Sequence, residues 1–308
     1  MATTVRVPIS LDEQIIGYHS LALMIIGTLL NFLTFVILCR KKFRNTRARP
    51  TLHYMRAVAI FDILMLYGWN LDHYLSSIHR IRILGQSIFS CRFFSFLSYF
   101  CPQTSAWLRV WISFDRFLSM HYLQRTCFNQ SNNVIIIITT TVTVLILLNA
   151  HFFIFVCFHR SNGTISALSW LYNIYPMWDY IHLVVYNFLP FIFMVIFNSG
   201  VIYHLIRVQR TTMVHQTAIN HRAISITLVI TTFLFLLMTV PATVAFAFFS
   251  NSNIVILRVL DALLYTHHIL GFPIYLLTFD EFRRECIAFI KFTPQVQVVP
   301  TAANVVIN

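Results

Sequence analysis

Charged residues are scarce in this sequence: Asp, Glu, Lys and Arg make up only 10% of the 308 residues, whereas hydrophobic residues make up 58%. The mean hydropathy of +0.72 lies well above that of water-soluble domains, which cannot bury so much apolar surface. Ile15–Cys39 and Ile224–Phe249 contain no charged side chain of these four types. A helix needs about 20 apolar residues to cross a hydrocarbon core about 30 Å thick. The scarcity of charge therefore excludes a water-soluble fold and predicts an integral membrane protein.

Other shortages disfavour particular classes of membrane protein. Only seven glycines occur and the hydropathy pattern does not repeat, which disfavours a transporter built from inverted repeats with broken helices. Six cysteines with no Cys-x-x-Cys pair are too few for a disulfide-rich scaffold. The 13 histidines include no His-x-x-x-His spacing on one helix, which disfavours a seven-helix zinc-dependent hydrolase. The histidines considered for such a site are His73, His151, His182, His267 and His268. We expect no cofactor, and a transporter or channel and a zinc hydrolase stay as alternatives.

The apolar runs predict an all-α membrane protein with seven transmembrane helices. The expected spans, in chain order, are 15–39, 52–77, 91–118, 133–157, 179–206, 219–249 and 255–278. The first span follows Asp12 and Glu13 rather than a basic leader, so we expect an uncleaved signal anchor. The chain then divides into an N-terminal tail (1–14), a seven-helix domain (15–278), a short cytoplasmic helix (279–291) and a cytoplasmic tail (292–308).

Lys and Arg residues gather at one set of helix ends, which sets the orientation because short basic loops stay in the cytoplasm. The segment 40–49 holds six of them, and most of the others fall on the same side. We therefore expect a multi-pass plasma-membrane protein with its N-terminus outside. A formal charge of +12 can also indicate a nucleic-acid surface, but these basic residues lie beside membrane spans and face anionic lipid. We expect the bilayer, and not nucleic acid, as their partner.

Two features at the outer ends of the spans agree with this orientation. Asn162-Gly163-Thr164 is a glycosylation sequon on the outer side, whereas Asn129-Gln130-Ser131 falls in a cytoplasmic loop and should stay unmodified. Of the six cysteines, only Cys91 and Cys157 lie at predicted extracellular helix ends, where oxidation is permitted.

Residue spacing in the third span carries a family resemblance. Cys91 opens this span and Asp115-Arg116-Phe117 closes it, with Arg116 25 residues after Cys91. Further landmarks follow in order along the chain, namely Asn31, Asp62, Pro190, Pro241, Tyr275 and the segment Phe282-Arg283-Arg284-Glu285-Cys286. In their joint order and spacing, residues 15–290 resemble a rhodopsin-type (class A) G-protein-coupled receptor of a divergent, peptide-receptor-like branch.

The sequence also departs from the pattern of that family. Phe117 replaces a tyrosine, Thr239 stands where a tryptophan usually precedes Pro241, and span four lacks its tryptophan. His221 replaces an acid, and span seven reads Gly271-Phe272-Pro273-Ile274-Tyr275, without the usual asparagine. These departures affect the usual activation switch rather than the fold.

The resemblance implies roles for individual residues. Asp115, Arg116 and Phe117 would contact a heterotrimeric G protein, with Arg116 exposed at the cytoplasmic end of span three and paired with Asp115 at rest. Cys91 and Cys157 would form a disulfide that ties span three to the second extracellular loop. Cys286 would carry a palmitoyl group. The core switch would consist of Asn31, Asp62, Ser105, Arg109, Pro241 and Tyr275.

Helical periodicity places polar and aromatic side chains on inward faces near the outer ends of several spans. We expect a ligand to bind between Trp69, His73, Ser98, Asp179, His182, Tyr186, Asp261 and Tyr265. Each of the aromatic residues can also be explained as a packing residue. Ser98 stands where amine receptors hold an aspartate, so an amine receptor is disfavoured. The three lysines all lie on the cytoplasmic side, which excludes an opsin because no retinal Schiff base can form. A small peptide is the favoured ligand, followed by a lipid or odorant-like molecule.

Arg109 lies one turn below Ser105 on the inward face of span three. Related receptors bind sodium through an aspartate and a serine that match Asp62 and Ser105, but Gly271 and Thr239 replace the other groups of that site. An uncompensated arginine at membrane depth costs at least about 2.5 kcal/mol. We therefore predict a buried Asp62–Arg109 ion pair, with hydrogen bonds from Arg109 to backbone carbonyls or waters as the alternative.

Overall fold

The computed structural model describes residues 10–40, 43, 51–121, 131–166, 177–211, 215–249 and 254–291. Several predicted features lie outside the described residues: most of the N-terminal tail, most of the basic segment 40–49, the sequon at Asn129 and the tail from residue 292. The side chain of His221 also lies outside them. The described chain is almost entirely helical, as predicted.

The helices follow one another with short breaks. In chain order they are α1 (Leu11–Leu38), α2 (Thr51–Leu66), α3 (Trp69–Tyr74), the π-helix η2 (Leu75–His79), the 3-10 helix η3 (Ile83–Gly85), α4 (Ile88–His121), α5 (Ser131–Asn149), α6 (His151–Phe155), α7 (Met177–His182), the π-helix η5 (Leu183–Phe188), α8 (Leu189–Thr211), α9 (His215–Phe248), α10 (Ile254–His267), α11 (Gly271–Thr278) and α12 (Asp280–Ile290). A small antiparallel hairpin joins β1 (Phe158–His159) to β2 (Ile165–Ser166).

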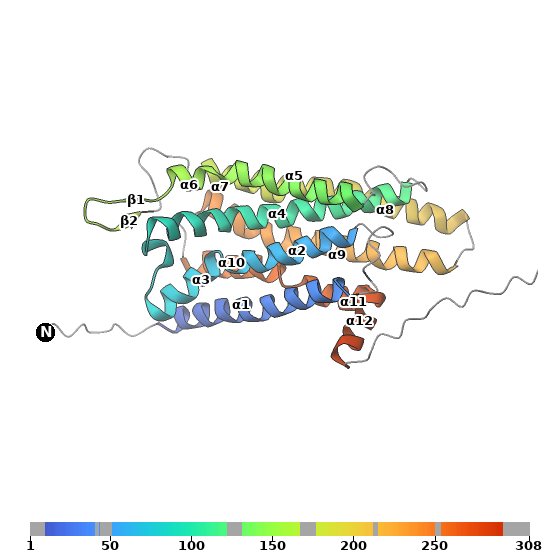
Figure 1. Cartoon of the computed structure of the whole chain (residues 1–308), viewed down its shortest axis with the longest axis horizontal. Helices are drawn as coiled ribbons and strands as arrows, with labels where there is room; N and C mark the ends of the chain where they lie inside the picture. The colour runs from blue at the N-terminus through green and yellow to red at the C-terminus, as the bar shows by residue number, and fades with distance from the viewer. Residues whose placement is uncertain are drawn as a thin grey trace, which may run out of the picture.

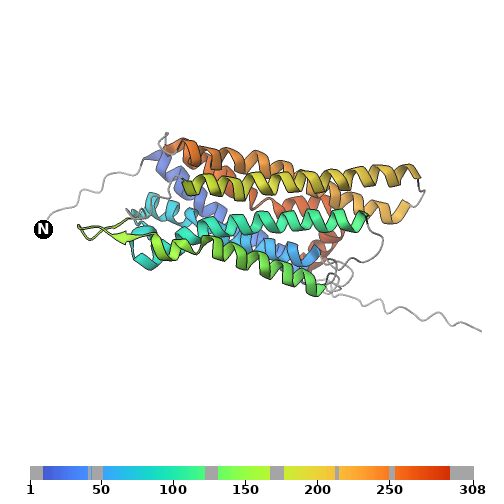
Figure 2. The ribbon, with the colours of Figure 1, turned by 90° about the horizontal axis from the view of Figure 1, so that it is seen from above.

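The long helices lie side by side along the long axis of the molecule (Figures 1 and 2). The start of α1, α3 and the β1–β2 hairpin lie at one end of this bundle, which we call the hairpin end. The helix α12 and the end of α11 lie at the opposite end, which we call the α12 end. Residues expected outside the membrane and residues expected in the cytoplasm are therefore separated at the two ends of one bundle.

Within the part of the chain that the structure describes, four stretches are long and apolar enough to cross a membrane: Leu11–Leu38, Asn132–Phe155, Met177–His204 and Val229–Phe248. A fifth is obtained if the two helices Val255–His267 and Gly271–Thr278, which meet at a bend of 42°, count as one span. The helix α2 has only 16 residues, and α4 contains many polar and charged side chains. The helix lengths and their composition indicate a membrane protein.

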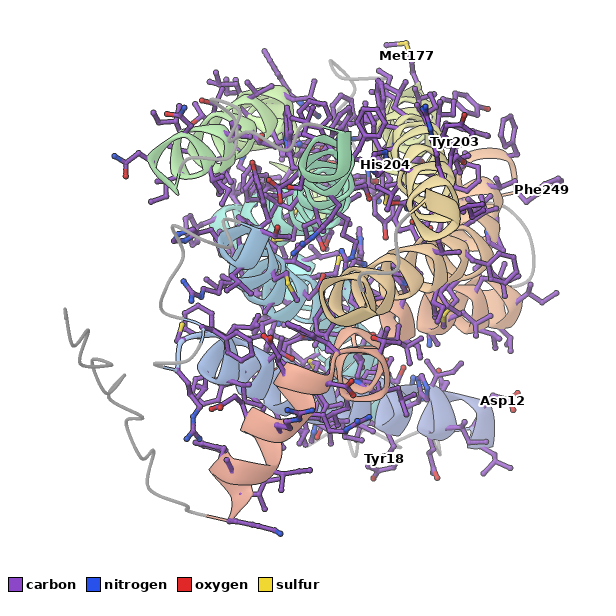
Figure 3. The ribbon with its side chains drawn as sticks, turned by 90° about the vertical axis from the view of Figure 1, so that its right-hand side faces the viewer. Asp12, Tyr18, Met177, Tyr203, His204 and Phe249 are labelled. Carbon is purple, nitrogen blue, oxygen red and sulfur yellow. A yellow bond between two sulfur atoms is a disulfide. The ribbon has the colours of Figure 1, made fainter. Side chains whose placement is uncertain are left out.

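The distribution of side chains supports a membrane setting, because it is inverted relative to that of a soluble protein. Only 17% of the most apolar window of Asn132–Phe155 is buried, and Leu147 in this stretch is 68% exposed. Tyr18, Tyr203 and Phe249 point away from the bundle (Figure 3). Polar side chains fill much of the interior, including Asp62, Gln103, Thr104, Asn187, Thr239 and His268. An apolar exterior around a hydrogen-bonded interior is the arrangement that a bilayer requires.

Pro190 explains the π-helix η5. The amide of Leu189 donates to the carbonyl of Val184, five residues earlier, and Pro190 has no amide hydrogen to donate. The carbonyl of Val185 therefore has no helical partner, and the indole Nε1 of Trp107 donates to it at 3.0 Å. This bond fixes α4 against η5 and sets the direction in which Tyr186 points.

Some of the predicted spans contain a break that hydrophobicity alone does not reveal. The second span is interrupted at Tyr67–Gly68 between α2 and α3, and the seventh at His268–Leu270 between α10 and α11. At the second break the side chain of Asn31 donates to the backbone carbonyl of His268 at 3.0 Å. The short cytoplasmic helix expected at 279–291 corresponds to α12, at Asp280–Ile290.

Candidate functional site

A cavity of about 280 Å³ lies inside the bundle near the hairpin end. All eight residues that we expected to bind a ligand line it: Trp69, His73, Ser98, Asp179, His182, Tyr186, Asp261 and Tyr265. Met65, Tyr99, Pro102, Thr243, Phe246 and Leu264 complete the lining. The side chains come from α2, α3, α4, α7, η5, α9 and α10, so the site exists only once these helices pack together.

A second cavity of about 430 Å³ adjoins the first, and we call it the vestibule. The two cavities share Trp69, His73, Phe246 and Asp261. The remaining lining of the vestibule is mostly polar or charged: Glu13, Asp72, Ser76, Ser77, Arg80, Arg82, Leu257 and Arg258. We call the first cavity, with its more aromatic lining, the deep cavity.

Hydrogen bonds hold several lining side chains in place. The phenol of Tyr99 donates to Asp179 Oδ1 at 3.0 Å, and the phenol oxygen of Tyr265 accepts from the backbone amide of Trp69 at 3.2 Å. His182 Nδ1 lies 3.0 Å from the amide nitrogen of Gln103. That amide is fixed in turn by Asn149, which donates to Gln103 Oε1 at 2.7 Å. The lining is therefore largely pre-organised.

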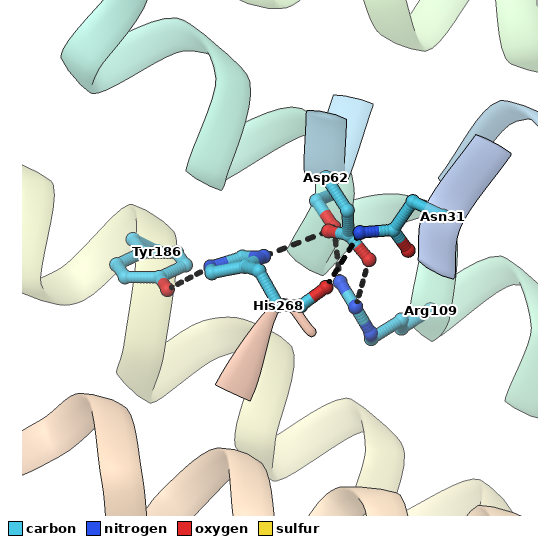
Figure 4. Close-up of polar contacts among 6 residues, drawn as sticks. Asn31, Asp62, Arg109, Tyr186 and His268 are labelled. Carbon is cyan, nitrogen blue, oxygen red and sulfur yellow. Dashed lines mark hydrogen bonds and ion pairs between the residues drawn. The ribbon is translucent and has the colours of Figure 1, made fainter. Parts of the chain in front are cut away.

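Below the deep cavity, Asp62 is the centre of a buried polar cluster (Figure 4). Arg109 Nη2 lies 2.7 Å from Asp62 Oδ2, so the predicted ion pair is confirmed. Ser105 Oγ donates to Asp62 Oδ1 at 2.5 Å, and Arg109 also donates to Ser105. The side chains of Asp62 and Arg109 are only 2% and 12% exposed. Both charges are therefore neutralised within the interior.

His268 is a further partner of Asp62 that the sequence did not suggest. Its Nδ1 lies 2.7 Å from Asp62 Oδ1, and its Nε2 lies 3.1 Å from the phenol oxygen of Tyr186 (Figure 4). The break after α10, which ends at His267, brings His268 level with Asp62. Since Tyr186 also lines the deep cavity, a continuous chain of polar contacts runs from this cavity to Arg109.

The other residues assigned to the core switch lie in two places. Asn31 and Tyr275 line a small cavity of about 20 Å³ together with Asp62 and Arg109, which is large enough for one water molecule. Pro241 lies within α9, away from this cavity. A second network, which the sequence did not suggest, surrounds this part of α9. In it Asn187 donates to Thr243 at 2.7 Å and accepts from Thr239 at 2.6 Å.

At the α12 end, the predicted G-protein contact is more enclosed than expected. Asp115 is buried and accepts a hydrogen bond from the hydroxyl of Thr51 at the start of α2. Arg116 is partly buried, so its predicted exposure was wrong. The ring of Phe117 packs on α8, where a Cβ added to Gly200 would lie 2.4 Å from Phe117 Cε2. The three residues lie on α4 where it contacts α2 and α8.

At the hairpin end, the disulfide between Cys91 and Cys157 is confirmed, with 6.1 Å between the two Cα atoms. Cys157 has a backbone φ of 68°, which turns the chain from α6 into β1. Arg92 Nε donates to the carbonyl of Val156 at 2.9 Å and holds the same corner. Asn162 is exposed in the turn between β1 and β2, where a glycosyltransferase could reach it.

The geometry does not support a palmitoyl group on Cys286. This residue is only 5% exposed and packs in a hydrophobic cluster with Phe43, Phe272 and Phe282, so its thiol faces the bundle. Burial also raises the pKa of the thiol, which reduces the fraction of reactive thiolate. The amphipathic face of α12 explains this burial, since residues four apart share one side of a helix.

Within the described residues, no three His, Cys, Asp or Glu side chains form a group that could hold a metal ion. No protein-family model matches the chain, and no curated protein matches it either. The arrangement of the cavities, the polar cluster and the two ends of the bundle is therefore the basis for assigning a function.

Proposed function

We propose that this chain is a rhodopsin-type G-protein-coupled receptor that binds a small peptide and activates a heterotrimeric G protein. One observation carries the proposal: the eight residues expected to bind a ligand line one cavity, and Tyr186 connects that cavity to the buried Asp62–Arg109 pair. Aromatic residues that serve only for packing do not require a series of hydrogen bonds leading away from the cavity. A receptor does need one, because ligand binding must alter a distant surface.

The proposal includes seven membrane spans, with α2, α3 and η2 forming the second span and α4 the third. Their polar residues do not conflict with this role, because Asp62, Ser105 and Arg109 are directed into the bundle and paired there. The disulfide and the sequon at Asn162 lie at the hairpin end, and both require a compartment outside the cytosol. We therefore orient the hairpin end and the N-terminus outward in the plasma membrane.

The polar chain suggests how a signal would cross the bundle. A ligand that displaces the phenol of Tyr186 would break its contact with His268 and change the hydrogen bonding of Asp62. Asp62 holds Arg109 of α4, and Arg116 lies two turns further along this helix, a rise of about 10 Å. A change in the Asp62–Arg109 contact would therefore shift α4 relative to α2 and α8 at the α12 end.

The decisive experiment is a cell assay of G-protein activation, with a peptide panel as the stimulus and an N-terminal epitope to measure surface expression on intact cells. Arg116→Ala should reach the surface but fail to signal. Arg284→Ala removes an exposed arginine of α12 and serves as the matched control, which should signal normally. Raised basal signalling in Arg116→Ala would instead mean that Arg116 restrains the resting state.

Two results would contradict the proposal. An Arg116→Ala variant that reaches the surface and responds normally would remove the assigned role of this residue. An epitope that antibodies reach only after permeabilisation would reverse the orientation. Stoichiometric zinc in the purified protein would favour the hydrolase, and solute uptake without G-protein activation would favour a transporter.

A further inference from the structure

Asp261 is a buried acid that faces the deep cavity, and no side chain or amide among the described residues donates a hydrogen bond to it. Its side chain is 8% exposed, and its nearest polar partner among the described residues is His73, whose Nδ1 lies 3.7 Å from Asp261 Oδ2. That separation exceeds a hydrogen bond. A carboxyl group held in a helical interior without a donor carries a desolvation cost, which a bound ligand with a donor would offset.

Asp179 adds a second carboxyl group to the same lining. Of its two oxygens, Oδ1 accepts one hydrogen bond, from Tyr99 at 3.0 Å, which leaves acceptor capacity unused. Five aromatic residues line the same cavity as the two acids: Trp69, Tyr99, Tyr186, Phe246 and Tyr265. Aromatic faces attract cations and repel anions. The lining of the deep cavity therefore matches a positively charged group.

The vestibule differs from the deep cavity in that three arginines, Arg80, Arg82 and Arg258, line it beside Glu13, Asp72 and Asp261. Arg80 is already neutralised, because its two terminal nitrogens lie 2.8 Å from the two carboxylate oxygens of Glu13. Neither Arg82 nor Arg258 has a carboxylate within ion-pair distance in the described part of the chain. Arg258 donates to the hydroxyl of Ser77 at 3.2 Å. Two guanidinium groups therefore remain available to an anion at the outer cavity.

We infer that the ligand is a short peptide with a cationic group in the deep cavity, beside Asp261 and Asp179, and a carboxylate in the vestibule, beside Arg258 and Arg82. This inference rests on the proposed function, and it deepens that function by defining the charge pattern of the ligand. An acidic group in the deep cavity would meet two carboxyl groups at low dielectric. An uncharged lipid would leave Asp261 without a donor.

The test uses the purified full-length protein in lipid nanodiscs and an equimolar pool of synthetic tetrapeptides in four charge classes. The classes are cationic with a free C-terminal carboxylate, cationic with a C-terminal amide, acidic, and uncharged. Peptides retained by the protein but not by empty nanodiscs are identified by mass spectrometry. The first class should be enriched over the other three.

Charge-removing variants then assign the two ends of the retained peptide. Asp261→Asn and Asp179→Asn should each weaken its binding by about tenfold to a hundredfold, the usual effect of losing a hydrogen bond to a charged group. Arg258→Gln should weaken the free carboxylate form but not its amide. Asp12→Asn removes an exposed acid outside both cavities and is the matched control.

The outcomes separate this inference from the proposed function. Enrichment of acidic or uncharged peptides, or of none, would overturn the inference. Equal retention of the carboxylate and amide forms would overturn the role of Arg258 and Arg82. If cationic peptides bind as expected but activate no G protein, the charge pattern stands and the receptor function fails. If acidic or uncharged peptides activate a G protein, the receptor function stands and the charge pattern fails.

Discussion

Replacement of Asp62 by asparagine should be strongly destabilising, because it removes the charge that neutralises Arg109. The pair is separated by 2.7 Å, and its side chains are 2% and 12% exposed, so little water can replace the carboxylate. Removing one partner of such a pair costs about 3–5 kcal/mol, since the other charge stays buried. An asparagine can still accept a hydrogen bond from Ser105, so we expect Asp62→Asn to fall near 3 kcal/mol, at the lower end of that range.

A double-mutant cycle isolates the ion pair from the rest of the cluster. Arg109→Met keeps the length of the aliphatic chain and leaves Asp62 with Ser105 and His268 as partners, so its cost should be smaller. The double variant removes both charges, so neither charge stays buried without its partner. We therefore expect the double variant to be more stable than Asp62→Asn alone.

The assay is a reversible denaturant titration of purified protein in mixed micelles, followed by tryptophan fluorescence. It requires no ligand and so tests the cluster independently of signalling. Two results would refute the reasoning: a loss below about 1 kcal/mol for Asp62→Asn, or a double variant as unstable as the sum of the two single variants. Either would mean that Arg109 is satisfied by backbone carbonyls or water instead of by Asp62.

Three further predictions concern other parts of the molecule. Tyr186→Phe removes the partner of His268 Nε2 and should cost about 1–3 kcal/mol in the same titration, whereas Tyr18→Phe, at an exposed position, should have no measurable effect. Gly200→Ala forces Phe117 to move and should cost about 1–3 kcal/mol, while Gly271→Ala, whose Cβ would lie 3.9 Å from its nearest neighbour, should be neutral or slightly stabilising; equal effects would show that Phe117 does not depend on Gly200. Asn162→Gln should abolish the glycosidase-sensitive shift in electrophoretic mobility, and a shift that persists would place the glycan, and with it the outer side, elsewhere.

Two kinds of prediction about residue positions were confirmed. One rested on helical periodicity, and the other on the free-energy cost of burying a charge. Seven-residue steps place Ser98 and Ser105 on one face of span three, whatever the neighbouring helices do. The pairing of Arg109 with Asp62 could be predicted because an arginine in the interior must find an acid, and the sequence offers few.

The predictions failed where the backbone departs from regular helix. Hydrophobicity does not reveal the π-helix before Pro190 or the break after α10, and these features decide that Tyr186 meets His268. The partial burial of Arg116 and the burial of Cys286 depend on how neighbouring helices cover a helix end. Side-chain packing sets the rotation of one helix against the next, and a periodic sequence pattern does not predict that rotation.

By itself, then, the sequence determined that the chain is a helical membrane protein and which side chains share one face of a helix, because these follow from local hydrophobicity and spacing. Only the tertiary structure decided which inward residues touch. The contact between Tyr186 and His268, the approach of His73 to Asp261 and the gathering of Arg80, Arg82 and Arg258 at the vestibule all arise between segments distant in the chain. Such contacts depend on the kinks and close approaches of the packed bundle, and no segment of the sequence specifies them alone.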